Sequence, residues 1–155
     1  MKKGFTIIEL LIVISVIAIL VGISMPRFKG MQDEGNITKA RGELKTLQAA
    51  VESYAIHHTN LAPAALADVT ASSPVMVSVL PTDPFGGGAD YGYAVSGSRR
   101  YYVIWSVGPA KNGSAAITDA GVATITNTSS CIYITNGSST ADGGGEVVDP
   151  PIGCG

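Results

Sequence analysis

The residues of this chain with a clear chemical use stand near its N-terminus, in the run Gly4-Phe5-Thr6-Ile7-Ile8-Glu9. Glu9 is a carboxylate inside the apolar segment 5–25. A charged side chain at the centre of a bilayer helix costs on the order of 3 kcal/mol or more, so Glu9 needs a partner of opposite charge. Cleavage after Gly4 would create that partner, because the new N-terminus at Phe5 would carry a free amine.

The spacing between Phe5 and Glu9 suits such a pairing. Residues four positions apart on a helix lie on the same face, about 6 Å apart along the axis. The amine and the carboxylate could then neutralise each other within one chain or, better, between neighbouring chains. We therefore predict that residues 1–4 form a leader peptide that is removed after Gly4.

Two ordinary interpretations of the N-terminus fit less well. A secretory signal peptide has its small-residue cleavage site after the apolar core. Here that site would lie near Gly22 to Met25, and cleavage there would discard Glu9. A generic single-span anchor explains the apolar segment, but it explains neither Glu9 nor the position of Gly4.

The run from Gly4 to Leu10 resembles the class III signal of the type IV pilin superfamily, which includes pilins and the pseudopilins of type II secretion. This resemblance implies that a prepilin peptidase cuts between Gly4 and Phe5 and that the Phe5 amine is N-methylated. It also implies that Glu9 acts in assembly as the acidic fifth residue of the mature chain. The resemblance is strong over residues 1–58 and weaker beyond them.

One long helix is predicted to position these residues. Residues 5–25 would span about 31 Å as a helix, close to the 30 Å or so of a bilayer core, so we expect a transmembrane segment that later enters a filament core. The basic residues at positions 2 and 3 place this N-terminus in the cytoplasm. Over residues 26–58 the helix continues in amphipathic form. Its apolar stripe comprises Ile37, Ala40, Leu44, Leu47, Val51 and Tyr54.

The junction between the two halves of this helix contains residues that weaken helices. Proline removes a backbone donor, and glycine lowers helix propensity. Gly22, Pro26 and Gly30 are therefore expected to give the helix flexibility, with bending or partial melting between Gly22 and Gly35. The resemblance adds that many members of the superfamily have a loosening proline at the position of Pro26.

Residues 59–155 are predicted to form a strand-rich globular head. The sequence indicates a connecting loop over residues 59–84, with a short helix around 64–69. Strands are expected at 91–95, 101–107, 122–125 and 131–134, with Ser96-Gly97-Ser98 joining the first two as a hairpin. The predicted fold is α+β: a long N-terminal helix, its apolar half protruding and its amphipathic half packed on a small antiparallel sheet.

The two cysteines, Cys131 and Cys154, lie in the C-terminal quarter of the chain. An exported domain meets an oxidising compartment, so we expect a disulfide between them, with two unpaired thiols as the alternative. A disulfide that closes a C-terminal loop is similar to many type IV pilins. Major pseudopilins, by contrast, do not usually have one.

Other chemistry is sparse. The chain contains no paired carboxylates, phosphate-binding loop or nucleophile motif that would indicate an enzyme. Its net charge of −2 and the lack of basic clusters with interleaved aromatics argue against nucleic-acid binding. Major pseudopilins have a calcium site in the loop after the central strands. Here Lys111 occupies that loop and only Asp119 is nearby, so we predict no cofactor, with Asp119 as a weak calcium candidate and an ordinary turn as the alternative.

The function predicted from these features is structural. The chain is expected to be a subunit of a helical homopolymer, either a type IV pilus or a secretion pseudopilus. By resemblance its partners are the prepilin peptidase, an inner-membrane assembly platform with its ATPase, minor pilins or pseudopilins, and the lipid bilayer before assembly. The expected location is the bacterial inner membrane with the head outside the cytoplasm, then a periplasmic or extracellular filament. The alternative is a membrane-tethered binding protein that does not polymerise.

Overall fold

The computed structural model describes residues 4–126, 131–141 and 146–147 of the 155-residue chain. The chain divides into two compact units, Met1–Gly35 and Asn36–Gly155. One α-helix, α1 (Ile7–His57), contains residues of both units. The predicted helix from residue 5 to about 58 is therefore confirmed to within two residues at each end.

Of the bending or partial melting expected between Gly22 and Gly35, the melting is not observed. Flexibility at Gly22, Pro26 and Gly30 stays a prediction. The backbone of α1 stays helical through Pro26 and through all three glycines of this stretch. Each glycine costs about 1 kcal/mol of helix stability and the proline about 3 kcal/mol. Because helix formation is cooperative, the long helical segments on both sides offset this cost. Judged by length and apolarity together, none of the helices over the described residues qualifies as a membrane span.

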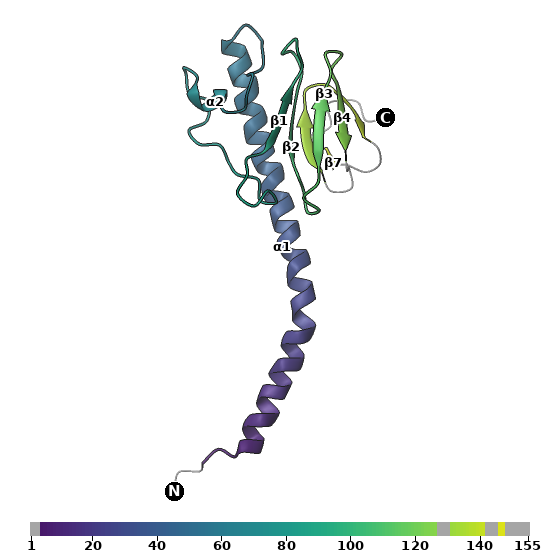
Figure 1. Cartoon of the computed structure of the whole chain (residues 1–155). Coiled ribbons are helices and arrows are strands. Elements are labelled where there is room, and N and C mark those ends of the chain that lie inside the picture. Colours follow the sequence, from purple (N-terminus) through teal and green to yellow (C-terminus); the bar gives the residue numbers. More distant parts are fainter. Residues whose placement is uncertain (1–3, 127–130, 142–145, 148–155) are drawn as a thin grey trace. The chain divides into compact units, whose positions relative to one another are not determined.

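Over its described residues, the head contains seven strands in two sheets. Figure 1 shows the strands as arrows. The first sheet has the order β1-β2-β5-β7, formed by β1 (Gly92–Val95), β2 (Tyr102–Ser106), β5 (Ile132–Thr135) and β7 (Glu146–Val147). The second has the order β3-β4-β6, formed by β3 (Ser114–Ile117), β4 (Val122–Thr126) and β6 (Ser138–Ala141). The α+β fold class is confirmed.

The pairing is antiparallel within β1–β2 and β2–β5, as predicted, and also within β3–β4, but β4–β6 and β5–β7 are parallel. All four predicted strands are present. The strands β3, β6 and β7 were not expected, because they are short and their small or polar residues lack the β-branched and aromatic pattern that marks a strand in sequence.

The predicted stripe of α1 packs against the first sheet. Ala40, Leu44, Leu47 and Val51 are completely buried, and the partly buried residues at either end of the stripe join the same cluster. This cluster anchors α1 to the head through apolar burial, at roughly 25 cal/mol for each Å² removed from water.

The strand β2 is buried on both faces. Tyr102 and Ile104 belong to the cluster that contains the α1 stripe, whereas Val103 packs with Ala123 and Ile125 of the second sheet. Figure 1 shows the corresponding order of layers, with β1 and β2 beside the C-terminal half of α1 and β3 and β4 on their other side. The prediction that alternate residues of this strand face the helix is confirmed.

Two local features complete the head. The short helix α2 (Asp68–Ala71) lies a few residues after its predicted position, and its Val69 is fully buried. In β1, Gly92 faces Trp105 across the strand pair. A Cβ atom on Gly92 would lie 2.1 Å from the indole ring, so only glycine leaves room for this close approach.

Candidate functional site

The N-terminus of α1 holds the residues that the sequence singled out. Gly4, Phe5 and Thr6 precede the helix without regular secondary structure, and all three are exposed. A Cβ atom on Gly4 would meet no other atom within 4 Å. Nothing in the described surroundings of Gly4 therefore requires a glycine, which leaves recognition by another protein as a reason for its presence.

Glu9 lies in the first turn of α1, where Thr6 caps the helix. The Glu9 backbone N–H donates to Thr6 Oγ1 at 3.3 Å, and the Thr6 hydroxyl donates to Glu9 Oε2 at 3.4 Å. This Thr-x-x-Glu arrangement is similar to a capping box, in which the residues at the N-cap and N3 positions satisfy each other's polar groups. The sequence signature was present, but the cap role of Thr6 was missed.

The cap changes the expected relation between Phe5 and Glu9. Because α1 begins at Ile7, Phe5 lies ahead of the first helical turn rather than on the same helix face as Glu9. A position before the cap leaves the backbone of Phe5 free of helical constraints. In the chain that still carries residues 1–4, the geometry expected for pairing within one chain is therefore not formed.

The helix that follows Glu9 exposes an unusual amount of apolar surface. Large apolar side chains between Ile7 and Ile23 are exposed to solvent by 46 to 84%. Contiguous exposed apolar surface on this scale marks a site of contact with protein or lipid. Glu9 itself is exposed among these side chains.

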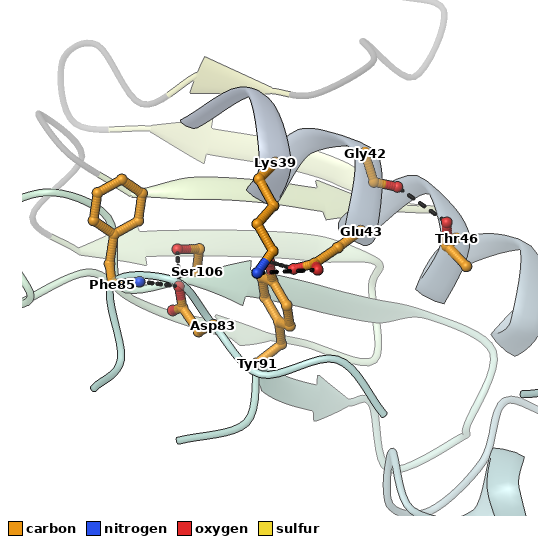
Figure 2. Close-up of polar contacts among 8 residues, drawn as sticks. All are labelled: Lys39, Gly42, Glu43, Thr46, Asp83, Phe85, Tyr91 and Ser106. Carbon is orange, nitrogen blue, oxygen red and sulfur yellow. Dashed lines mark hydrogen bonds and ion pairs between the residues drawn. The ribbon is translucent and has the colours of Figure 1, made fainter. Parts of the chain in front are cut away.

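In the head, α1 also contacts the first sheet through polar groups. The Tyr91 hydroxyl donates to Glu43 Oε2 at 2.6 Å, and Lys39 forms an ion pair with the other oxygen of Glu43 at 3.7 Å. Figure 2 shows Tyr91 and Lys39 beside Glu43. The Tyr102 hydroxyl donates to Glu52 Oε1 at 3.3 Å. Burial raises the pKa of both tyrosines well above the usual value, and the neighbouring glutamates raise it further.

The calcium candidate of the sequence, Asp119, lies beside the turn that joins β1 and β2. Asp119 Oδ1 accepts a hydrogen bond of 2.8 Å from the backbone N–H of Ser98, so Asp119 caps the turn between β1 and β2. Within the described ranges, no three His, Cys, Asp or Glu side chains gather closely enough to hold a metal ion. Asp119 thus caps a turn and belongs to no such group.

Cys131 is 1% exposed at the start of β5, and burial raises the pKa of its thiol to about 12, with the Asp83 carboxylate adding to the shift. Cys154 lies outside the described residues. The expected Cys131–Cys154 disulfide therefore stays a prediction.

Comparison with known proteins matches this N-terminal region to a described family. The prokaryotic N-terminal methylation motif matches residues 1–25. The type II secretion system core protein G of Pseudomonas aeruginosa is 25% identical over 134 residues, covering 78% of this chain and 93% of that protein. The protein of the same name from Escherichia coli is 27% identical over 121 residues, covering 70% of this chain and 82% of that protein. The N-terminal motif and these relatives make the chain similar to members of the type IV pilin superfamily.

Other relatives match a shorter part of this chain. A fimbrial protein of Pseudomonas aeruginosa is 40% identical over 52 residues, which cover 34% of each chain. No solved structure matches the chain. The similarity to the secretion proteins thus extends through the head, whereas the fimbrial similarity is limited to about a third of the chain.

Proposed function

We propose that this chain is the precursor of a subunit of a helical filament, and that the mature subunit begins at Phe5. The observation that carries this proposal is an exposed carboxylate, Glu9, in the first turn of a helix whose apolar side chains are also exposed. The prokaryotic N-terminal methylation motif over residues 1–25 supports this proposal independently. Bundling of many such helices would cover their apolar surface and would bury Glu9.

Cleavage after Gly4 supplies the group that Glu9 lacks in the precursor. Within the described residues, the Glu9 carboxylate accepts a long hydrogen bond from the Thr6 hydroxyl at 3.4 Å. In the filament, the Phe5 amine of a neighbouring subunit forms an ion pair with Glu9. Any other axial register leaves a buried charge unpaired, at a penalty of roughly 3–5 kcal/mol, so the pair fixes the register of the incoming subunit.

The filament is proposed to be a pseudopilus of a type II secretion system rather than a surface pilus. The coverage of the relatives favours this choice, because the match to the secretion protein of Pseudomonas aeruginosa covers 78% of this chain and the fimbrial match covers 34%. The prepilin peptidase, the assembly platform with its ATPase and the minor subunits are partners implied by this choice. Before assembly, the chain is proposed to be anchored in the inner membrane with its head outside the cytoplasm. The N-terminal methylation motif and the relatives support this location.

Replacement of Glu9 tests the proposal. We expect the Glu9→Gln variant to be cleaved after Gly4 and retained in the membrane fraction. It should form at least about tenfold less filament, because a loss of roughly 3 kcal/mol exceeds the 1.4 kcal/mol that corresponds to a factor of ten. Glu34→Gln removes a charge from the same helix outside the apolar segment and serves as the control, with filament yield close to that of the unaltered chain.

The measurement is electron microscopy of sheared filaments from cells that overproduce the chain, with mass spectrometry of the membrane fraction. An undiminished filament yield from Glu9→Gln would refute the register role. A chain that is cleaved normally but never polymerises would instead support the alternative of a tethered binding protein.

A further inference from the structure

The head contains a buried carboxylate that the filament proposal does not use. Asp83 lies on the loop that leads into β1, and only 2% of its surface is exposed. Its Oδ1 accepts hydrogen bonds from the Phe85 backbone N–H at 2.9 Å and from the Ser106 hydroxyl at 2.7 Å. Its Oδ2 accepts one from the Val107 backbone N–H at 2.8 Å. Figure 2 shows Asp83 between Phe85 and Ser106.

These bonds connect two segments that are distant in sequence. Phe85 belongs to the loop before β1, which is closed on itself by the bond from the Asp83 backbone N–H to the Ala89 carbonyl at 2.9 Å. Ser106 and Val107 stand at the end of β2, where the loop 107–113 begins. The Asp83 side chain therefore joins the loop before β1 to the start of the loop 107–113. The N–H and O–H groups that donate to its two oxygens offset the desolvation of the carboxylate.

The loop 107–113 is also organised by its own bonds. The Gly113 N–H donates to the Val107 carbonyl at 3.1 Å, and the Lys111 N–H donates to the Gly108 carbonyl at 2.9 Å. The Gly108 N–H donates to the Ser106 hydroxyl oxygen at 3.2 Å, which links the loop to the same hydroxyl that Asp83 accepts from. The geometry of this loop thus depends on Asp83 through Ser106 and Val107.

This loop is where the resemblance to major pseudopilins implies a calcium ion, and the residues present do not fit one. Calcium prefers several oxygen ligands, commonly carboxylates. The segment 106–113 contains no carboxylate, and Asp119 is engaged at the Ser98 turn. Lys111 and Asp90 both line a cleft of about 210 Å³ beside this loop, so a basic residue accompanies the single carboxylate there. Over the described residues, no three His, Cys, Asp or Glu side chains gather closely enough to hold a metal ion.

We propose that Asp83, rather than a bound calcium ion, holds the loop 107–113 in place, so that the head of this protein is stable without calcium. The three donors to Asp83 supply the connections between loops that a shared cation would otherwise make. This inference concerns the fold of the head and is independent of filament formation, so either proposal can fail while the other stands.

The test compares thermal unfolding of the full chain in detergent with millimolar calcium chloride and with millimolar EGTA. We expect the same Tm in both conditions. Asp83→Asn should lower the Tm by about 5 °C or more in both, because an amide nitrogen would face one of the N–H donors. It should also speed proteolytic cleavage within residues 107–113.

The matched control is Asp119→Asn, which changes an exposed carboxylate that also accepts a backbone N–H. It should leave cleavage at residues 107–113 unchanged. If Asp83→Asn does not fold, Ser106→Ala decides, because it removes one donor to Oδ1 and should still speed cleavage there. A higher Tm in calcium chloride than in EGTA would overturn the proposal, as would normal cleavage of the loop in Ser106→Ala or in folded Asp83→Asn.

Discussion

At the scale of single residues, Glu9 has two roles at the N-terminus of α1: it takes part in the helix cap, and it is proposed to pair with a neighbouring subunit. Thr6 and Glu9 satisfy each other in the precursor, and the same carboxylate is proposed to receive a neighbour's amine after cleavage. The hydroxyl bond to Glu9 Oε2 is long at 3.4 Å, and a longer bond is a weaker one. A protonated amine would therefore be the stronger partner for this carboxylate.

The cap leads to a prediction about Thr6. Replacement of an N-cap threonine by alanine costs about 1 kcal/mol of helix stability, so Thr6→Ala should loosen the first turn of α1. We expect faster hydrogen exchange at the Glu9 amide, measured by NMR in detergent micelles. Thr6→Ser keeps the hydroxyl and should exchange like the unaltered chain. Equal exchange in the alanine and serine variants would show that the hydroxyl does not cap this helix.

At the scale of elements, the sequence correctly predicted which faces of α1 and β2 are buried, because apolar periodicity determines them. The stripe that includes Leu44 and Leu47 and the alternation in β2 both pointed to the correct faces, because burial repeats every three to four residues in a helix and every two in a strand. The fold class, the long helix and four strands followed from these patterns. The Asp83 clamp did not, because its partners Ser106 and Val107 are brought near only by the tertiary fold.

Strand β3 shows why other elements escaped prediction. Its sequence Ser-Ala-Ala-Ile has little intrinsic strand preference, and it is a strand because β4 supplies a complete antiparallel ladder beside it. Pairing with a partner outweighs propensity in such short segments. In α1, similarly, Pro26 and its neighbouring glycines weaken the helix locally without ending it, because long helical segments flank them.

The tyrosines between α1 and the first sheet predict how stability depends on pH. Burial, with the adjacent glutamates, raises the pKa of Tyr91 and Tyr102 above the usual value near 10. The folded state then keeps protons that the unfolded state releases. Their contribution is complete below about pH 10 and is lost as the pH rises further.

Urea unfolding at neutral pH and above about pH 10 checks this prediction. The free energy of unfolding should fall on the alkaline side, and it should fall less steeply in Tyr102→Phe, which lacks one of the two phenols. Ionisation of the tyrosines in the folded protein without loss of stability would contradict it.

At the scale of the whole molecule, the two units differ in how they meet their surroundings. Asn36–Gly155 has its own buried core, whereas the helix in Met1–Gly35 exposes its apolar side chains. Association with lipid or with protein, including other copies of the chain, would remove such a surface from water. A pairing between Glu9 and a neighbour's Phe5 explains why a carboxylate is retained on a surface that must become buried.

Cryo-electron microscopy of the assembled filament tests this pairing most directly, through the distance between the Glu9 carboxylate and the nearest Phe5 amine. We predict a chain that begins at Phe5, with the carboxylate oxygens within about 4 Å of the amine of an adjacent subunit. A filament in which Glu9 contacts no neighbouring amine, or in which the subunits still carry residues 1–4, would contradict the account.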